Sequence, residues 1–405
     1  MSEAPPRSCD VVVVGAGIVG LAVARELSLR HDGIRVAVIE AEDAIGRHQT
    51  GHSSGVIHAG VYYAPGSLKA KLCVAGAAEL YDYCDQRGIE AQRSGKLIVA
   101  TRPEELERLD ELERRATANA VPGLRRLAAA EIPAVEPHAV GIAALHSPAT
   151  GTVDFSEVAA AFAADLATAG GSLTTRCRVT AITERGDAAA IAHSGGMTEA
   201  RAVAVCAGAW SDRVASASGA PADPRIVPFR GAYLRLRPER SELVRANVYP
   251  VPDPELPFLG AHLTRAHDGG VLLGPSALIV GARDAYRLSR LSPRDLRDTL
   301  AWPGTWRMIR RHWRTGALEL RRAVSKRSFV AEARRLVPEL RAEDFIAGPV
   351  GVRAQAVARD GSLIDDFIVS ETGRAVHVRN APSPAATSAL PLARLIADRL
   401  GPLLD

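Results

Sequence analysis

The chain has 405 residues, of which 47% are hydrophobic and 24% are charged, and its formal net charge is +4. This composition is typical of a soluble globular protein, and the length is sufficient for two domains or one large α/β unit. The small positive excess comes without a basic stripe interleaved with stacking aromatic side chains, so we expect no nucleic-acid partner.

Cysteine usage and the first residues both favour the cytoplasm. The five cysteines are scattered, odd in number and without a C-x-x-C pair, which argues against a disulfide framework and a structural zinc site. The stretch MSEAPPRSCD lacks a charged and then apolar leader. The longest apolar run, residues 11–24, is interrupted by glycine and too short to span a bilayer. We expect a cytoplasmic protein that is at most peripheral on the inner face of the membrane.

The first forty residues follow a βαβ pattern. Residues 11–14 are a continuous β-branched run, typical of a buried parallel strand, and a helix at 18–30 and a strand at 34–40 follow. The turn between them reads Gly15-Ala16-Gly17-Ile18-Val19-Gly20. Its glycines let a pyrophosphate approach the backbone at the helix N-terminus, and Glu40 can accept ribose hydroxyls. The pattern predicts dinucleotide binding, and the acid at position 40 favours FAD or NAD over NADP.

Residues 48–63, HQTGHSSGVIHAGVYY, combine three histidines with small and hydroxyl-bearing residues. Such a segment is either a solvated loop or one wall of a reaction chamber. The i, i+4 spacing of His48 and His52 would suit a metal on a helix, but Gly51 and the following serines oppose a helix and no carboxylate is close in sequence. We therefore expect no metal. A structural role is the usual fate of one histidine, and we expect at least one of the three to line the chamber.

The rest of the chain alternates between helical and extended patterns. We expect helices at 103–119, 156–170 and 386–400, a helical arginine-rich block at 305–336, and strands near 172–182, 189–194, 203–208, 228–280 and 375–379. The βαβ pattern thus returns after an antiparallel middle, which predicts two interleaved domains. We place the dinucleotide-binding domain at 1–90, 150–225 and 350–405, and the substrate-binding domain at 91–149 and 226–349.

Three further stretches carry site candidates. VCAGAWSD at 205–212 ends a buried strand in small residues that would admit a ligand, or it is a plain strand-to-helix turn. NAPSPAATSA at 380–389 leads into the last helix, whose free N–H groups can hold a negative pole, or it is a connector. In GVRAQAVARDGSLIDDF at 351–367, Arg353 is placed either to grip a carboxylate or to form an ion pair with Asp365 or Asp366.

These motifs together resemble the L-2-hydroxyglutarate oxidase/dehydrogenase family, a branch of the D-amino-acid-oxidase-like flavoproteins. The resemblance extends over nearly the whole chain and rests on GAGIVG with Glu40, HQTGHSSGVIHAGVYY, PFRG at 228–231, YPVPDPELPFLGAHLTR at 249–265, GVRAQAV and NAPSPAATSA. It implies an α/β fold in which a glutathione-reductase-type FAD-binding Rossmann domain is interleaved with an antiparallel-sheet (α+β) substrate domain. The block 305–336 and RDAY at 283–286 depart from the family pattern.

The resemblance also implies which residues hold FAD. Carried over by position, they are Gly15, Gly17, Ile18, Val19, Gly20, Glu40, Ala41, His48, Thr50, Gly51, Ser53, Ser54, Gly55, Val179, Ala207, Gly208, Trp210, Pro384, Ala385, Ala386 and Thr387. We expect the flavin to be bound non-covalently. No cysteine follows Cys206, so a C-terminal thiol link is excluded, whereas a histidyl link through His48 or His58 stays open.

The implied reaction is oxidation of (S)-2-hydroxyglutarate to 2-oxoglutarate, with a hydride passing to flavin N5 and the electrons leaving to oxygen or a quinone. It needs a base for the hydroxyl proton and cations for the carboxylate. We expect His58 as the base, with His262 second, and Arg353 as the grip on the carboxylate beside the reacting carbon. The candidates for contacts with the rest of the substrate are Lys96, Tyr62, Arg230, His262 and Arg265.

Other functions fit parts of the sequence. A flavin-dependent amine or amino-acid oxidase of the same fold, or an oxidase of another 2-hydroxy acid, is the first alternative. The basic block 307–335 would suit a flavoprotein held peripherally on anionic lipid, although a solvated helical face has the same pattern. An NAD-dependent reductase is the third alternative, and an absorbance spectrum of the purified protein would distinguish it from a flavoprotein.

Overall fold

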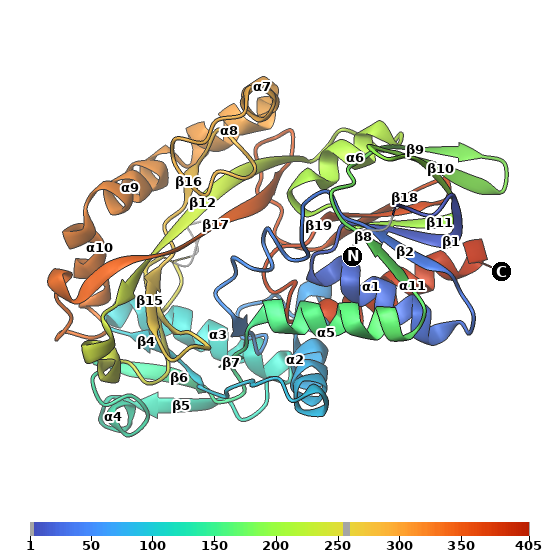
Figure 1. Cartoon of the computed structure of the whole chain (residues 1–405). Helices are drawn as coiled ribbons and strands as arrows, with labels where there is room; N and C mark the ends of the chain where they lie inside the picture. The colour runs from blue at the N-terminus through green and yellow to red at the C-terminus, as the bar shows by residue number, and fades with distance from the viewer. Residues whose placement is uncertain (1–3, 254–259, 405) are drawn as a thin grey trace.

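Two β-sheets lie side by side in the computed structural model, which describes residues 4–253 and 260–404 (Figure 1). The chain visits the two sheets alternately, so each sheet is built from segments far apart in sequence. Part of the motif at 249–265, namely residues 254–259, lies outside the described residues.

The first sheet has the order β18-β19-β11-β1-β2-β8, which is parallel except for the antiparallel edge strand β18, and the hairpin of β9 and β10 extends from β11. β1 pairs in parallel with β2 and β11, and the β11–β19 and β2–β8 pairs are parallel as well. The strands are β1 (Ser8–Val14), β2 (Val36–Ile39), β8 (Ser172–Thr174), β9 (Val179–Arg185), β10 (Ala188–His193), β11 (Gly196–Val205), β18 (Ile368–Thr372) and β19 (Ala375–Asn380). The prediction of a βαβ start is confirmed.

Helices cover the first sheet on both faces. Val11 and Val13 point into the core formed with the helices on one face, while Val12 and Val14 point into a second core on the other. Because successive side chains of a strand alternate between faces, a strand covered on both sides is apolar throughout. The covering helices are α1 (Ile18–Arg30), α2 (Leu68–Arg87), α5 (Phe155–Thr168) and α11 (Ala389–Leu404) on one face and α6 (Ser211–Ala217) on the other.

The second sheet is mainly antiparallel, as the sequence predicted for the middle of the chain. Its order is β16-β12-β15-β14-β13-β4-β6-β5, and β17 pairs with β12 over most of its length. The strands are β4 (Lys96–Ala100), β5 (Arg125–Ala128), β6 (Ala143–Ser147), β12 (Arg225–Leu236), β13 (Asn247–Pro250), β14 (His262–Arg265), β15 (Val271–Gly274), β16 (Leu278–Ile279) and β17 (Phe345–Val357). A small third sheet pairs β3 (Val56–Ile57) with β7 (Gly151–Thr152).

Helices of the second half of the chain lie along the outer side of the second sheet (Figure 1). They are α7 (Pro293–Ala301), α8 (Pro303–Arg311), α9 (Trp313–Val324) and α10 (Lys326–Ala333). Phe329 and Val330 of α10 pack against Leu97 and Leu263 of the sheet. The prediction of helix in the arginine-rich block is confirmed. The remaining helices are α3 (Leu106–Ala118), as expected, and the short α4 (Ile132–Val135).

Two details bear on the expected organisation. The domain boundary expected at residue 350 falls inside β17, which stays in the second sheet until Val357. Over residues 4–253 and 260–404, no helix combines the length and the apolar character that a bilayer crossing requires.

Candidate active site

The carboxyl ends of the parallel strands meet at one edge of the first sheet. Gly15 follows β1, Glu40 follows β2 and Cys206 follows β11. Cys206 N donates to Val14 O at 2.9 Å, and the Glu40 carboxylate accepts from Ala16 N at 2.6 Å. The glycine turn, the acid and the loop after β11 are therefore in contact, as dinucleotide binding at this edge requires.

The three glycines of the turn have different physical reasons. A Cβ at Gly20 would lie 2.0 Å from Gly15 O, and a Cβ at Gly15 would lie 2.5 Å from Cys206 O. At Gly17 the nearest atom would be Thr50 Oγ1 at 3.5 Å, which is an ordinary contact. Gly17 is the N-cap residue of α1 and, having no side chain, supplies no capping hydrogen bond of its own. The protein itself thus requires Gly15 and Gly20, while Gly17 keeps a cradle open at the N-terminus of α1, where an anionic group binds favourably.

The segment 48–63 runs between the two sheets (Figure 1) and begins against this turn. Thr50 Oγ1 accepts from Ile18 N at 3.0 Å, so a hydroxyl 32 residues away in sequence caps α1. Further along, Gly55 has a φ of +74°, and a Cβ there would lie 2.8 Å from Val153 O. Backbone packing therefore accounts for the small residue at position 55.

His48 and His52 contact Tyr286 in the loop between β16 and α7, and His52 also contacts β17 of the second sheet. His48 Nδ1 lies 3.0 Å from the Tyr286 hydroxyl, and His48 Nε2 lies 3.2 Å from Glu42 Oε1. The His52 ring stacks on Tyr286 with 4.0 Å between centroids, and His52 Nδ1 is 2.7 Å from Val350 O. Both imidazoles thus have structural partners. Among the described residues no group of three or more histidine, cysteine or acidic side chains is placed to hold a metal.

The other cofactor candidates lie along the same edge. Gly208 has a φ of +50°, and Trp210 lies against the His48 ring at 4.6 Å. Val179 is buried at the start of β9, two residues after Cys177, whose N donates to Glu40 O at 2.8 Å. The remaining candidates lie in the same loops as the residues already described; they are Ala41, Ser53, Ala207 and Pro384 to Ala386.

His58 joins the segment 48–63 to the start of α11. Its backbone N donates to Thr387 Oγ1 at 3.1 Å, and its Nε2 lies 3.1 Å from Ser383 Oγ. The loop before α11 is therefore held against His58. Of the three histidines in the segment 48–63, His58 is the one that faces the polar cluster around Lys96. The sequence left open whether this loop is a ligand-binding helix end or a plain connector.

Alternation along β4, β13 and β14 sorts their side chains onto two faces. Leu97 and Leu263 enter the apolar core under α10. Lys96, Tyr249 and His262 lie on the opposite face. There the Lys96 ammonium lies 4.3 Å from the centroid of the Tyr249 ring, and the His262 ring stacks on that same tyrosine at 4.0 Å.

The electrostatics of this cluster keep its imidazoles neutral and its lysine charged. Burial, and next the charge of Lys96, hold the pKa of His58 well below its ordinary value. Burial lowers the pKa of His262 to about 3, and His262 Nδ1 lies 2.9 Å from Gly260 O, so its Nε2 is left as the acceptor. Burial lowers the pKa of Lys96 to about 8. The charge of Arg353 acts on both histidines as well.

Arg353 lies on β17 opposite Phe229 of β12 and is exposed. Of its expected acidic partners, Asp365 pairs with Lys69 Nζ at 2.7 Å, and Asp366 accepts from Lys69 N at 3.0 Å. Both carboxylates thus make contacts with the start of α2.

Two of the predicted substrate contacts have backbone partners of their own, and one of them lies on the other face of the sheet. Arg265 donates through Nη1 to the carbonyls of Ser241 and Val244, because it is an odd number of residues from His262 and so points to the other face of β14. Arg230 donates through Nε to Tyr286 O at 3.3 Å. The structure therefore brings together His58, Lys96, Tyr62, His262 and Arg353, and it corrects the placement of Arg265.

Sequence reasoning missed several residues of the site. Tyr249 stacks on His262, Tyr286 holds the two histidines of the loop, and Ser383 faces His58. Burial raises the pKa of Tyr233, and Ser54 acts to lower it. Each depends on pairing between distant segments, and alternation in AYLRLR was the only local signal for any of them.

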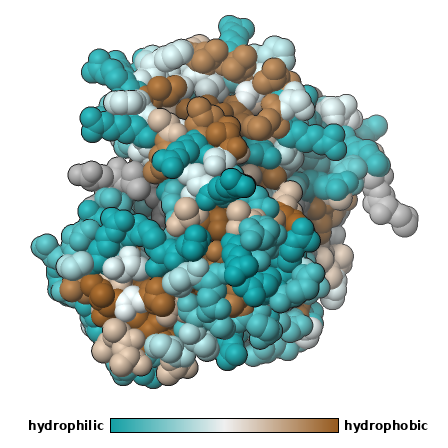
Figure 2. Space-filling view, turned by 90° about the vertical axis from the view of Figure 1, so that its left-hand side faces the viewer, coloured by the Kyte–Doolittle hydropathy of each residue, from teal (hydrophilic) through white to brown (hydrophobic). Residues whose placement is uncertain are grey.

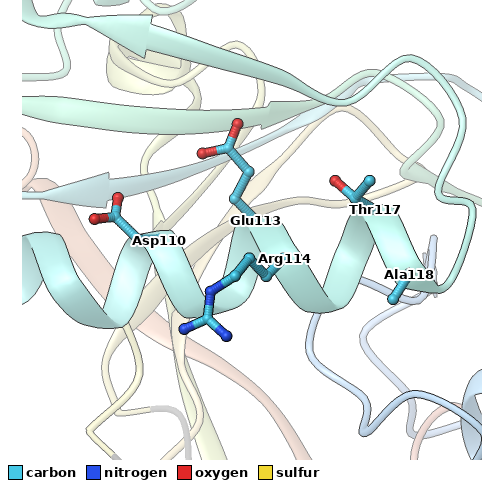
Figure 3. Close-up of a pocket in the computed structure, with 5 residues that line it drawn as sticks. All are labelled: Asp110, Glu113, Arg114, Thr117 and Ala118. Carbon is cyan, nitrogen blue, oxygen red and sulfur yellow. The ribbon is translucent and has the colours of Figure 1, made fainter.

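The surface hollow shown in Figure 3 is not part of this site. It is lined by one face of α3, including Asp110, Glu113 and Arg114. Asp110 and Glu113 pair with Arg126 at 2.8 and 3.3 Å, and Arg114 pairs with Glu111. These charges are thus neutralised among themselves on the molecular surface, where each pair contributes little.

Comparison with known proteins agrees with this geometry. Residues 10–399 match the family of FAD dependent oxidoreductases. The chain is 44% identical over 415 residues to the mitochondrial L-2-hydroxyglutarate dehydrogenase of Homo sapiens, covering 98% of this chain and 90% of that protein. It is 42% identical over 382 residues to the L-2-hydroxyglutarate dehydrogenase of Indibacter alkaliphilus, covering 94% and 96%.

Solved structures share the fold at lower identity. L-alpha-glycerophosphate oxidase from Mycoplasma pneumoniae, with FAD bound, superimposes with a TM-score of 0.79 at 22% identity over 98% of this chain and 95% of that chain. Glycine oxidase from Geobacillus kaustophilus gives a TM-score of 0.72 at 21% identity with the same coverage. The fold class is confirmed, and this chain belongs to the FAD dependent oxidoreductase family and, within it, to the L-2-hydroxyglutarate dehydrogenases.

Proposed function

We propose that this enzyme oxidises (S)-2-hydroxyglutarate to 2-oxoglutarate. One observation supports the proposal above the others: the cluster combines two cations, Arg353 and Lys96, with two imidazoles that burial keeps neutral. A 2-hydroxy acid with two carboxylates would supply the negative charges, and a neutral imidazole can take its hydroxyl proton. The curated relatives carry the same activity in their names.

FAD fits the edge of the first sheet. Gly17 leaves a cradle that a Cβ would fill at the N-terminus of α1, and Glu40 lies beside it. We propose that the domain built on this sheet holds FAD through the glycine turn, segment 48–55, Val179, residues 207–210 and the loop at 384–387. When bound, FAD accepts the hydride from the substrate. Because His48 and His58 both have partners for their rings, we propose non-covalent binding, and colourless protein after acid precipitation would confirm it.

The chain's own residues would then bind the substrate and move one proton. Arg353 would hold the carboxylate next to the reacting carbon in a bidentate pair. His58 would accept the hydroxyl proton, since it faces the cluster and contacts the loop before α11. His262 is the second candidate, because its Nδ1 contact to Gly260 leaves Nε2 as an acceptor.

The reaction is tested by anaerobic bleaching of the bound flavin. Purified holoenzyme is mixed with both enantiomers of 2-hydroxyglutarate, with other chiral 2-hydroxy acids and with amino acids. We expect (S)-2-hydroxyglutarate to bleach the flavin fastest. Faster bleaching by an amino acid would establish the amine-oxidase alternative instead.

The residue roles are tested in single-turnover flavin reduction. His58→Ala should slow reduction roughly 10²–10⁴-fold while FAD stays bound. An unchanged rate in this variant with a slowed rate in His262→Ala would move the role of base to His262. Arg353→Ala should weaken substrate binding and slow reduction together, and an unchanged Michaelis constant would contradict its assignment.

We also propose that the enzyme docks on an anionic membrane through an apolar–arginine surface on α7 to α9. Ten of the fifteen exposed large hydrophobic side chains of the described residues lie within 279–324. Trp313, Leu320 and Val324 are 61%, 56% and 75% exposed at positions i, i+7 and i+11 of α9, where they share one face. Figure 2 shows apolar side chains gathered on this side of the molecule, among hydrophilic ones.

Charge supports a lipid over a protein partner for the apolar–arginine surface. Arg310, Arg314 and Arg321 are exposed between its apolar side chains, and Arg314 lies over the Trp313 ring at 5.5 Å. Apolar groups flanked by cations suit the interface of an anionic bilayer. A membrane quinone is then the nearby electron acceptor, so we propose quinone in preference to oxygen.

The test is sedimentation with anionic and neutral vesicles. Wild-type enzyme should bind anionic vesicles in a salt-sensitive way, and Trp313→Glu should bind less. Leu29→Glu, an equally exposed leucine on α1, is the matched control. Equal binding of wild type and Trp313→Glu would refute docking through the apolar–arginine surface. Reoxidation of reduced enzyme faster by oxygen than by a soluble quinone would refute the acceptor.

A further inference from the structure

We infer that Lys96, with the hydroxyl of Tyr62, forms the specificity site for the second carboxylate of the substrate and selects 2-hydroxy acids that carry two carboxylates over those that carry one. The inference rests on the proposed function and deepens it, because it assigns the selectivity of that same site to one ammonium group.

Lys96 is buried without an anion. It is 1% exposed, and over the described residues its ammonium forms no ion pair and no hydrogen bond. Its neighbours are the rings of Tyr249 at 4.3 Å and Tyr62 at 5.2 Å. Two ring faces stabilise a cation only modestly, whereas taking an ammonium out of water is costly. An anionic ligand would supply the missing partner and so explain why a lysine is buried at this position.

Tyr62 supplies a second, independent sign of a ligand. Its hydroxyl is buried and has no hydrogen-bond partner, although buried hydroxyls are normally paired. Burial raises its pKa well above the ordinary value, so it keeps its proton and can donate. Since the Lys96 ammonium lies 5.2 Å from the centroid of the Tyr62 ring, the ammonium and the phenol are neighbours, and a carboxylate has acceptor sites for both donors.

The other candidates for the second carboxylate are already engaged or uncharged. Arg265 donates to two carbonyls on the opposite face of β14, and Arg230 donates to Tyr286 O. His262 is neutral, since burial lowers its pKa to about 3. Arg353 is the remaining charged candidate on this side, and the proposed reaction uses it for the carboxylate beside the reacting carbon.

Lys96 should also make selectivity depend on pH. The groups that act on it or on which it acts are His58 and His262 as neutral rings, the Tyr62 and Tyr249 phenols, and the thiol of Cys73. Burial lowers the pKa of Lys96 to about 8. Below that pH the ammonium is charged and binds the second carboxylate; above it the charge is lost. The free-enzyme profile of kcat/KM should therefore fall above pH about 8 for a diacid and stay level there for a monoacid.

The test compares Lys96→Met holoenzyme with wild type on (S)-2-hydroxyglutarate and on (S)-2-hydroxyvalerate, which has the same carbon chain with a methyl end. A lost charge-assisted hydrogen bond should lower kcat/KM for the diacid by about 10- to 100-fold. The monoacid should react as well or better. Tyr62→Phe should lower diacid activity less. Lys71→Met, the same change at an exposed lysine of α2, is the matched control and should alter neither substrate.

The outcomes separate the inference from the proposed function. A Lys96→Met enzyme that binds FAD and keeps the wild-type preference for the diacid overturns the inference and leaves the proposed function standing. Wild-type flavin that (S)-2-hydroxyglutarate does not bleach overturns both. If Lys96→Met does not fold, the wild-type pH profile decides alone: parallel profiles for the two substrates above pH about 8 overturn the inference.

Discussion

Alanine substitutions can distinguish the roles of Gly17 and Gly20 in the first turn, because each adds one methyl group. In Gly17→Ala the added Cβ meets no backbone, since its nearest atom is Thr50 Oγ1 at 3.5 Å, and the φ of −77° at position 17 suits alanine. In Gly20→Ala the Cβ would lie 2.0 Å from Gly15 O, so backbone must move. We expect the apoprotein of Gly17→Ala to unfold within about 1 kcal/mol of wild type and that of Gly20→Ala to lose about 1–3 kcal/mol.

FAD binding should respond in the opposite order. The Gly17→Ala methyl enters the cradle at the N-terminus of α1, where each charge-assisted hydrogen bond to a phosphate contributes about 1.5–3 kcal/mol. Loss of one such bond weakens FAD by about 10- to 100-fold. Chemical unfolding of the apoproteins and titration with FAD, followed by quenching of its fluorescence, measure both quantities. Wild-type FAD affinity in Gly17→Ala, or instability of its apoprotein equal to that of Gly20→Ala, would refute the reasoning.

Three further changes test the scaffold and the electrostatics. Thr50→Val leaves Ile18 N without its acceptor and should cost about 1–3 kcal/mol in apoprotein unfolding; an unchanged midpoint would show that water replaces the hydroxyl. Arg283→Met strips the buried Asp212 of its bidentate partner and should cost about 3–5 kcal/mol by denaturant unfolding; a loss below 1 kcal/mol would contradict a buried pair. Because burial holds the pKa of His58, the proposed base, well below its ordinary value and lowers the pKa of His262 to about 3, both rings stay neutral as pH falls, and flavin reduction should stay constant from pH 7 to 5; a decline centred near pH 6.5 would mean that an unperturbed histidine titrates.

The sequence predicted best where the physical cause is local. The run at 11–14 is apolar because both faces of β1 are covered, and Gly20 in the turn that follows is required by the nearby Gly15 O. Gly15 itself is required by Cys206 O, a distant contact, but the glycine pattern marks the turn without knowledge of that contact. By contrast, α2 was not predicted, although Ser67 caps its first turn and Gly88 ends it in the left-handed region. Ser67 and Gly88 were sufficient to predict the two ends of the helix, whose sequence between them is LKAKLCVAGAAELYDYCDQR.

The active-site cluster could be predicted only in part, because strand phase decides it. His262 and Arg265 lie an odd number of residues apart on β14, so the alternation of side chains along a strand places them on opposite faces. This correction was within reach of the sequence once the strand was recognised. Tyr249 is different, since its stacking on His262 depends on the pairing of β13 with β14, and nothing near residue 249 indicates it.

The charges of the cluster couple specificity to proton transfer. Without substrate, burial and the charges of Lys96 and Arg353 hold the pKa of both imidazoles so low that neither is an effective base. A substrate with two carboxylates would offset both cations and raise the pKa of the ring that accepts the proton. A monocarboxylate would offset one and leave the base weaker. We therefore expect a diacid to be favoured twice, in binding and in the chemical step, so that a monoacid should show a lower rate of flavin reduction even at saturation. Equal saturating rates for the two substrates would place all of the selectivity in binding.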